Sequence, residues 1–178
     1  MADLQLIFKA LTFAAEKHKN QRRKDSIGTP YINHPIGVAA NIIEFGQDND
    51  TATIIAAILH DTIEDTNTTY EEILDNFGKE IADIVMECTD NKKLPRQERK
   101  DLQVINASHK SDKAKVVKMA DKLHNLNDLL VNPPPDWTCE RVSEYFQWSK
   151  KITDQMLSAN EGLGKALEKT YIQFGNSC

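Results

Sequence analysis

The sequence predicts an all-α protein, a single-domain helical bundle. Apolar residues recur along most of the chain at the three- and four-residue spacing of helices with one buried face, whereas the alternation typical of strands is almost absent. Glycine and proline, which interrupt helices, number only 7 and 6 in 178 residues. A chain of this length fits one domain, and no repeat or shift in composition marks an internal boundary. We therefore expect residues 1–178 to form that domain.

The N-terminal part is predicted to hold two helices separated by a polar loop. Residues 20–31 are rich in turn-forming types and include a basic cluster at 21–24, so they predict the loop. The second helix is expected to begin at Asn33, which can cap it, with Pro35 tolerated in its first turn, and to end near Gly46. The first helix precedes the loop and carries one apolar stripe, formed by Leu4, Ile7, Phe8, Leu11, Ala14, Ala15 and His18.

The middle of the chain is predicted to contain the central helix of the bundle. Residues 50–65 are apolar on most sides, which indicates one helix running through the interior. Thr69 and Glu72 form the pattern of a capping box at the start of the next helix, and Gly78 suits its C-terminal end. Further helices are expected at residues 79–88, 95–108 and 112–131.

The C-terminal part is predicted to add two amphipathic helices after a break. Three consecutive prolines at 133–135 set the break, because proline lacks a backbone N–H and clashes with the preceding turn of a helix. The first of the two helices presents one apolar face, formed by Val142, Tyr145, Phe146, Ser149, Ile152 and Met156.

Charge and cysteine content narrow the classes of function. A net charge of −5 argues against a nucleic acid or an anionic membrane as partner, because both require a basic face. No run approaches the ~20 apolar residues that a membrane span needs. Cys88, Cys139 and Cys178 are an odd number without a C-x-x-C pair, and they predict reduced thiols in a cytoplasmic protein.

His60 and Asp61 are the first candidates for chemistry. Both interrupt an apolar stretch, and a buried carboxylate without a partner costs several kcal/mol. A divalent cation reverses that cost, because it becomes the largest local charge. Glu64 and Asp65 follow one helical turn later and place further acidic groups on adjoining faces. The alternative is a local hydrogen-bonded pair at the end of a helix.

Two distant residues favour the metal. His34 lies at the start of a predicted helix, where its side chain can reach into a cleft, and Asp121 interrupts an apolar run with Asn125 one turn later. Two imidazoles and two carboxylates form a mixed nitrogen and oxygen set that suits Mn²⁺, Fe²⁺ or Zn²⁺ better than Ca²⁺. Helical periodicity alone does not pair residues so far apart in the chain.

The pairing comes from a resemblance. His34, His60-Asp61 and Asp121 match the H…HD…D pattern of the HD-domain metal-dependent phosphohydrolases. Within that superfamily, three blocks resemble the hydrolase domain of the Rel/SpoT enzymes of the bacterial stringent response, and the likeness extends over essentially the whole chain. The chain is most similar to a stand-alone hydrolase of the kind found in animals. The blocks are HKNQRRKDSIGTPYINHP at 18–35, AAILHDTIEDT at 56–66 and VVKMADKLHNLN at 116–127.

The resemblance implies an activity and roles for named residues. It implies an HD-type domain that hydrolyses guanosine 3′,5′-bis(diphosphate), or ppGpp, to GDP and pyrophosphate with one Mn²⁺ per chain. The metal ligands would be His34, His60, Asp61 and Asp121, and the catalytic acidic pair Glu64 and Asp65. The substrate would be contacted by Arg23, Lys24 and Asn125.

Other interpretations stay open. The basic residues at 22–24 would, without the neighbouring motif, most often form a solvated loop. His18 is interpreted as a hydrogen-bonded structural histidine, and His124 as a residue that supports the site without binding metal. Two other functions compete with the first: removal of a phosphate from another ribose-phosphorylated nucleotide such as NADPH, at its 2′ position, and a nucleotide-binding module without turnover. The sequence leaves the oligomeric state open.

Overall fold

The described residues, 2–175, form an all-α structure, as the sequence predicts. In this computed structural model they contain helices and loops, and no β-strand occurs between residues 2 and 175. The α-helices are α1 Ala2–Lys17, α2 Asn33–Glu44, α3 Thr51–Leu59, α4 Thr62–Asp65, α5 Tyr70–Phe77, α6 Lys79–Cys88, α7 Arg96–Asn106, α8 Asp112–Val131, α9 Cys139–Thr153 and α10 Glu161–Gly175, with short 3₁₀ turns at Ala107–His109 and Leu157–Ala159.

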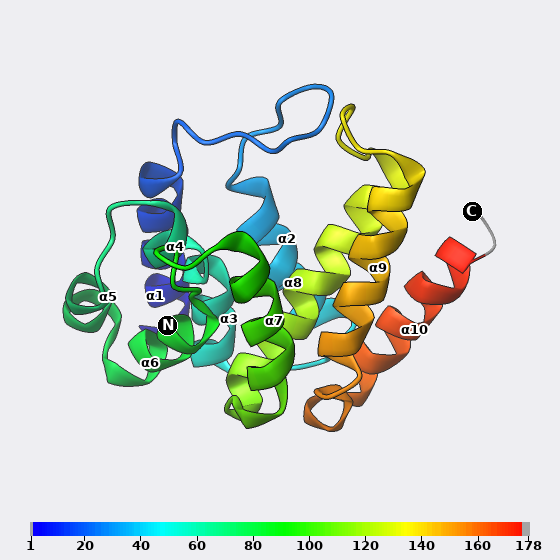
Figure 1. The fold of residues 1–178 in the computed structure, drawn as a ribbon. Helices are drawn as coiled ribbons and strands as arrows, with labels where there is room; N and C mark the ends of the chain where they lie inside the picture. Colours follow the sequence, from blue (N-terminus) through cyan, green and yellow to red (C-terminus); the bar gives the residue numbers. More distant parts are fainter. Residues whose placement is uncertain (1, 176–178) are drawn as a thin grey trace.

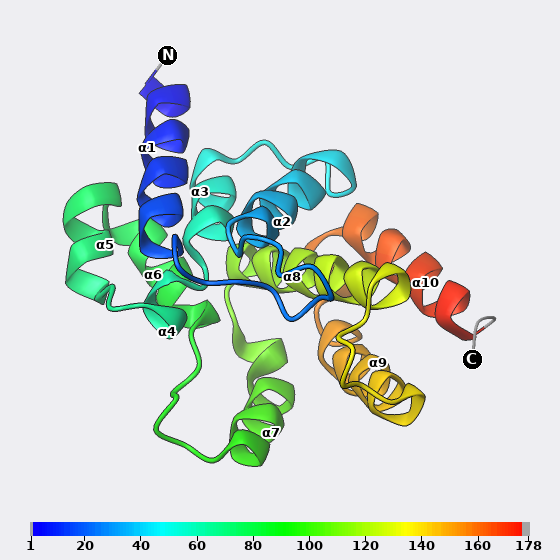
Figure 2. The same ribbon diagram turned by 90° about the horizontal axis from the view of Figure 1, so that it is seen from above.

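Helix α8 lies at the centre of the bundle. It contacts α2, α3 and α6 on one side and α9 and α10 on the other (Figures 1 and 2). Helix α3 is buried over most of its length, from Thr53 to Leu59, as expected for an interior helix. The loop between α1 and α2 passes over the end of α2 toward the loop after α8, where the Ser26 hydroxyl lies 3.2 Å from Oδ1 of Asn132.

Most predicted boundaries agree with the structure. Helices α6 and α8 span the predicted residues, and Thr69 caps α5 by accepting a hydrogen bond from the backbone N–H of Glu72. Gly78 ends α5 with a φ of 87°, a conformation that favours glycine. The predicted cap at Asn33 is wrong. Ile32 holds the N-cap position, because the carbonyls of the preceding turn already accept the N–H groups of Asn33 and His34.

The predicted helix over residues 50–65 is interrupted, and this is the main difference from expectation. Helix α3 ends at Leu59, and a separate turn, α4, begins at Thr62. Two side chains bind carbonyls that a continuous helix would use: Nδ1 of His60 lies 2.7 Å from the carbonyl of Ala57, and the Thr62 hydroxyl donates to that of Leu59 at 2.7 Å. The interruption therefore falls at His60 and Asp61.

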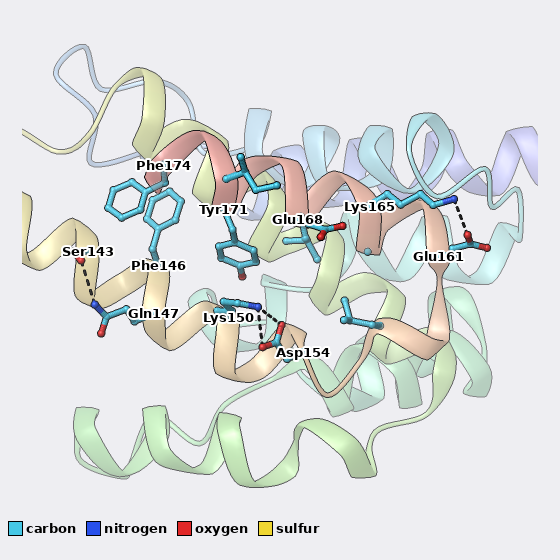
Figure 3. Close-up of a pocket in the computed structure, with 14 residues that line it drawn as sticks. Ser143, Phe146, Gln147, Lys150, Asp154, Glu161, Lys165, Glu168, Tyr171 and Phe174 are labelled. Carbon is cyan, nitrogen blue, oxygen red and sulfur yellow. Dashed lines mark hydrogen bonds and ion pairs between the residues drawn. The ribbon is translucent and has the colours of Figure 1, made fainter. Parts of the chain in front are cut away.

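A groove of about 700 Å³ lies between α9 and α10 (Figure 3). Phe146 and Phe174 stack at its side with ring centroids 3.9 Å apart, and the ion pair of Lys150 with Asp154 lies at its rim. None of the site residues predicted from the sequence lines this groove.

Two further expectations concern the chain as a whole. Within residues 2–175, no helix has the length and apolar character needed to cross a membrane. Cys88 is buried and Cys139 is exposed, whereas Cys178 lies outside the described residues.

Candidate metal centre and nucleotide cavity

Four predicted ligands converge on one buried point. Nε2 of His34 lies 3.2 Å from Oδ1 of Asp121 and 3.6 Å from Oδ2 of Asp61. Nε2 of His60 lies 3.1 Å from Oδ2 of Asp61 and 3.8 Å from Oδ1 of Asp121. His34, His60 and Asp121 each offer a ligand atom within 4.8 Å of the other two.

Each of these side chains comes from a different part of the bundle. His34 lies in the first turn of α2, His60 and Asp61 lie at the interruption after α3, and Asp121 lies midway along α8. On a continuous helix, two neighbours would point about 100° apart. His60 and Asp61 keep helical backbone angles, and their side chains reach the same point from adjoining faces, with Nε2 of His60 3.1 Å from Oδ2 of Asp61.

The donor atoms fit a divalent metal ion. Nδ1 of His60 faces a carbonyl and must donate, so Nε2 carries the free lone pair. That nitrogen is buried and meets no hydrogen-bond partner within the described chain. Burial alone would lower the pKa of His60, but the carboxylates of Asp61 and Asp121 raise it to about 9. The surroundings thus favour positive charge at this point, which a divalent cation supplies.

Hydrogen bonds orient both carboxylates. Oδ1 of Asp121 accepts from Nδ2 of Asn125 at 2.6 Å, and Oδ2 accepts from the Lys122 ammonium at 3.2 Å. Burial would raise the pKa of Asp121, but the charge of Lys122 and the hydrogen bond to His34 hold it well below its usual range. The Tyr31 hydroxyl donates to Oδ2 of Asp61 at 2.5 Å.

His124 supports the centre from behind His34. The two Nδ1 atoms lie 3.1 Å apart, so one ring donates and the other accepts. His124 fits there only because residue 37 is glycine: a Cβ at Gly37 would lie 2.1 Å from Nε2 of His124. A second hydrogen bond of this kind is the usual way in which proteins fix the tautomer of a metal-binding histidine.

Glu64 and Asp65, the predicted acidic pair, have different surroundings. Oε2 of Glu64 accepts the backbone N–H of Asp90 at 2.9 Å, and Oε1 lies 3.9 Å from Nη1 of Arg99. Burial raises the pKa of Glu64, and the charges of Asp90 and Asp61 add to that effect. The raised pKa makes Glu64 a stronger base than an exposed glutamate.

Asp65 is held on both oxygens. Its Oδ2 accepts from Nε2 of Gln21 at 2.8 Å, and its Oδ1 pairs with the ammonium of Lys92. Asp65 thus lies beside a cation, Lys92, and its part in catalysis stays a prediction.

The predicted substrate residues line a cavity of about 630 Å³ that adjoins His34. Nη2 of Arg23 donates to Oδ1 of Asn125 at 2.8 Å and to Oδ2 of Asp128 at 2.7 Å. The Arg23 guanidinium also lies over the Tyr31 ring, 5.8 Å from its centroid. Lys24 and Asp65 belong to the same wall. The basic cluster therefore does not form a uniform solvated loop, because Arg23 is directed into the cavity.

Sequence reasoning missed several residues of the site. Gln21, Tyr31 and Asp128 contact predicted residues, and Gly37 makes space for one of them. Tyr31 lies one turn before His34 within a motif block, which is the only signal that pointed to it. The importance of the others arises from contacts between distant segments.

Comparison with known proteins agrees with this geometry. The HD domain family matches residues 10–144, which include all the predicted site residues. The protein of Xenopus tropicalis named guanosine-3′,5′-bis(diphosphate) 3′-pyrophosphohydrolase MESH1 is 51% identical, over 98% of this chain and 97% of its own. The Homo sapiens protein of that name is 47% identical, over 95% of this chain and 94% of its own.

A solved structure agrees as well. Described as a metazoan ortholog of SpoT that hydrolyzes ppGpp, it matches with a TM-score of 0.93 and 43% identity over 96% of each chain. The chain therefore belongs to the HD-domain family and, within it, to the Rel/SpoT homologues that animals carry as MESH1.

Proposed function

We propose that this protein is a single-domain, metal-dependent 3′-pyrophosphohydrolase that converts ppGpp to GDP and pyrophosphate. The observation that carries the proposal is the meeting of His34, His60, Asp61 and Asp121 around the buried Nε2 of His60, which lies 3.1 Å from Oδ2 of Asp61, beside a cavity with an inward-facing arginine. The activity printed for the MESH1 relatives, which match nearly the whole chain, supports it.

The four residues would act as ligands of one Mn²⁺ per chain. Two imidazole nitrogens and two carboxylates make a mixed set that suits Mn²⁺, Fe²⁺ or Zn²⁺. When bound, the ion would activate water and polarise the phosphoryl oxygen.

Removal of Asp61 or Asp121 leaves too few anionic ligands, so Asp61→Ala and Asp121→Ala should each lose both bound metal and activity. Full metal occupancy in both variants, measured by elemental analysis, would contradict the ligand assignment.

The protein's own side chains supply the remaining chemistry. Hydrolysis breaks the bond between phosphorus and the ribose 3′-oxygen, so a proton must leave the attacking water and one must reach that oxygen. Glu64, with its raised pKa, takes the proton of the water and returns it to the leaving 3′-oxygen, and Asp65 keeps Lys92 beside the site. Arg23, Lys24 and Asn125 bind the nucleotide, by stacking on the base or by donating to phosphate oxygens.

The decisive experiment is a product assay on a panel of nucleotides. The purified protein is incubated with Mn²⁺ and ppGpp, NADPH or 3′-phosphorylated nucleotides, with Asp121→Ala as the inactive control. We expect GDP and pyrophosphate in equal amounts from ppGpp. If NADPH is the only nucleotide hydrolysed and the product is inorganic phosphate, the protein is a 2′-phosphatase instead. Tight binding of every nucleotide without any product would instead indicate a binding module.

A further inference from the structure

A buried histidine outside the metal centre is linked by hydrogen bonds to Asp65, one member of the predicted acidic pair. His18 follows the last turn of α1 and is only 2% exposed. Its Nδ1 lies 2.6 Å from Oε1 of Gln21, and Nε2 of Gln21 lies 2.8 Å from Oδ2 of Asp65. These two hydrogen bonds link the end of α1 to the wall of the nucleotide cavity.

The chemistry of the three groups fixes the direction of both bonds. An ionised carboxylate only accepts, so Asp65, which is paired with Lys92, requires the amide nitrogen of Gln21 to face it. The amide oxygen of Gln21 then faces His18, and Nδ1 of His18 must carry a proton. Both polar groups of the Gln21 amide are thereby engaged.

This arrangement leaves one ring nitrogen of His18 without a hydrogen bond, which lowers the stability of the fold. With its proton on Nδ1, His18 presents a bare Nε2, and this buried atom has no hydrogen-bond partner anywhere in residues 2–175. Such an unpaired group lowers stability, whereas an apolar side chain would pack there without that cost. The presence of a histidine at this position therefore points to a task for its other nitrogen.

We propose that His18 and Gln21 are positioning residues that hold the carboxylate of Asp65 in one orientation. The proposal rests on the role given to Asp65 in the proposed function. His18 fixes the Gln21 amide, and Gln21 in turn fixes Asp65, so that Lys92 stays paired at the edge of the cavity. The His18 ring also packs against Tyr31 with centroids 5.0 Å apart, and Tyr31 orients Asp61. A leucine at position 18 keeps an apolar side chain against Tyr31, so His18→Leu removes only the hydrogen bond to Gln21.

Kinetics of four variants test the link. Gln21→Leu and His18→Leu should each lower kcat on ppGpp by about 10²-fold, the usual effect of misplacing a reacting group by ~1 Å, with KM and metal content unchanged. The double variant should be no worse than either single variant, because both break the same connection. His18→Asn should retain most of kcat, since its amide nitrogen can replace Nδ1.

Three kinetic outcomes would overturn the proposal. They are a multiplied loss in the double variant, no loss in His18→Leu, and a further loss when Gln21→Leu is added to Asp65→Ala. In that last background Gln21 has no carboxylate to position, so its removal should have no effect.

A spectroscopic measurement tests the link without using activity. Nitrogen-15 NMR of the histidine side chains should show a proton on Nδ1 of His18, and Gln21→Leu should shift that signal. His109, which is exposed, serves as the control and should not change. A ring with its proton on Nε2 alone would refute the hydrogen-bond direction. If the wild type turns over no nucleotide, the proposed function fails while this result still decides whether the connection exists.

Discussion

At the scale of single residues, Glu64 has the surroundings of a general base. Its half-buried carboxylate has a raised pKa, with Oε2 accepting the backbone N–H of Asp90 and Oε1 3.9 Å from Nη1 of Arg99. We predict that Glu64→Gln retains metal and nucleotide affinity but loses at least about a hundredfold in kcat, since an amide cannot accept a proton. Glu71→Gln, an exposed change on α5, is the matched control. Near-normal turnover by Glu64→Gln would remove Glu64 from the mechanism.

Two adjacent arginines offer a second test at this scale. Arg23 points toward Asn125 and Asp128 inside the cavity, whereas Nη1 of Arg22 bonds back to the carbonyls of Lys19 and Gln21. Arg23→Ala should weaken nucleotide binding by tenfold or more, because a charge-assisted contact contributes roughly 1.5–3 kcal/mol. Arg22→Ala should have a much smaller effect. Equal KM values for both variants and the wild type would show that neither arginine takes part in nucleotide binding.

The site residues differ in how far a sequence can predict them. His60 and Asp61 stand out because polar side chains within an apolar run carry a desolvation cost that needs an explanation. His34 and Asp121 lie far from His60 and Asp61 in the sequence, and only the resemblance to HD-domain enzymes connected them to that pair. Gln21 appears in the sequence only as a member of the cluster at 21–24 and of the motif block at 18–35, because its importance depends on contacts with His18 and Asp65 that no local pattern encodes.

At the scale of helices, the close approach of α2 and α8 depends on Gly37. A methyl group there would overlap the His124 ring at 2.1 Å, and that ring holds His34 by a hydrogen bond. Gly37→Ala should therefore displace His124 and lower metal affinity by about 10- to 100-fold, the usual effect of losing a partner behind a metal ligand. Gly164→Ala on α10 is the control, because its nearest contact would be an ordinary 3.4 Å. Titration of the metal-free proteins with Mn²⁺ measures both affinities, and equal values would contradict this role of His124.

Helix positions were predictable, but the interruption after α3 was not. Apolar spacing and caps such as Thr69 and Gly78 are local signals, and they predict α5, α6 and α8 nearly to the residue. The end of α3 has no glycine or proline to mark it. It arises because His60 and Thr62 use their side chains to bind carbonyls of the preceding turn. Residues with acceptable helical propensity thus end a helix through contacts that appear only once they are buried.

At the scale of the whole molecule, bound metal should stabilise the fold. The centre joins α2, the end of α3 and α8, so an ion bound there favours the folded state over the unfolded one. At a hundredfold excess over its Kd, an ion adds about 2.7 kcal/mol, which corresponds to roughly 5–10 °C in Tm for a domain of this size. Chelation should lower Tm by that amount in the wild type and leave Asp121→Ala unchanged. An identical chelator effect in both proteins would place the stabilising ion elsewhere.

The wide separation of the ligands along the chain also matters during synthesis. A nascent chain that ends before α8 has His34, His60 and Asp61 but not Asp121, the ligand that the central helix provides. Binding of the metal by all four predicted ligands must therefore wait until α8 has left the ribosome and packed against α2 and α3. The ion would then bind late in folding, and only to chains in which α8 has already packed against α2 and α3.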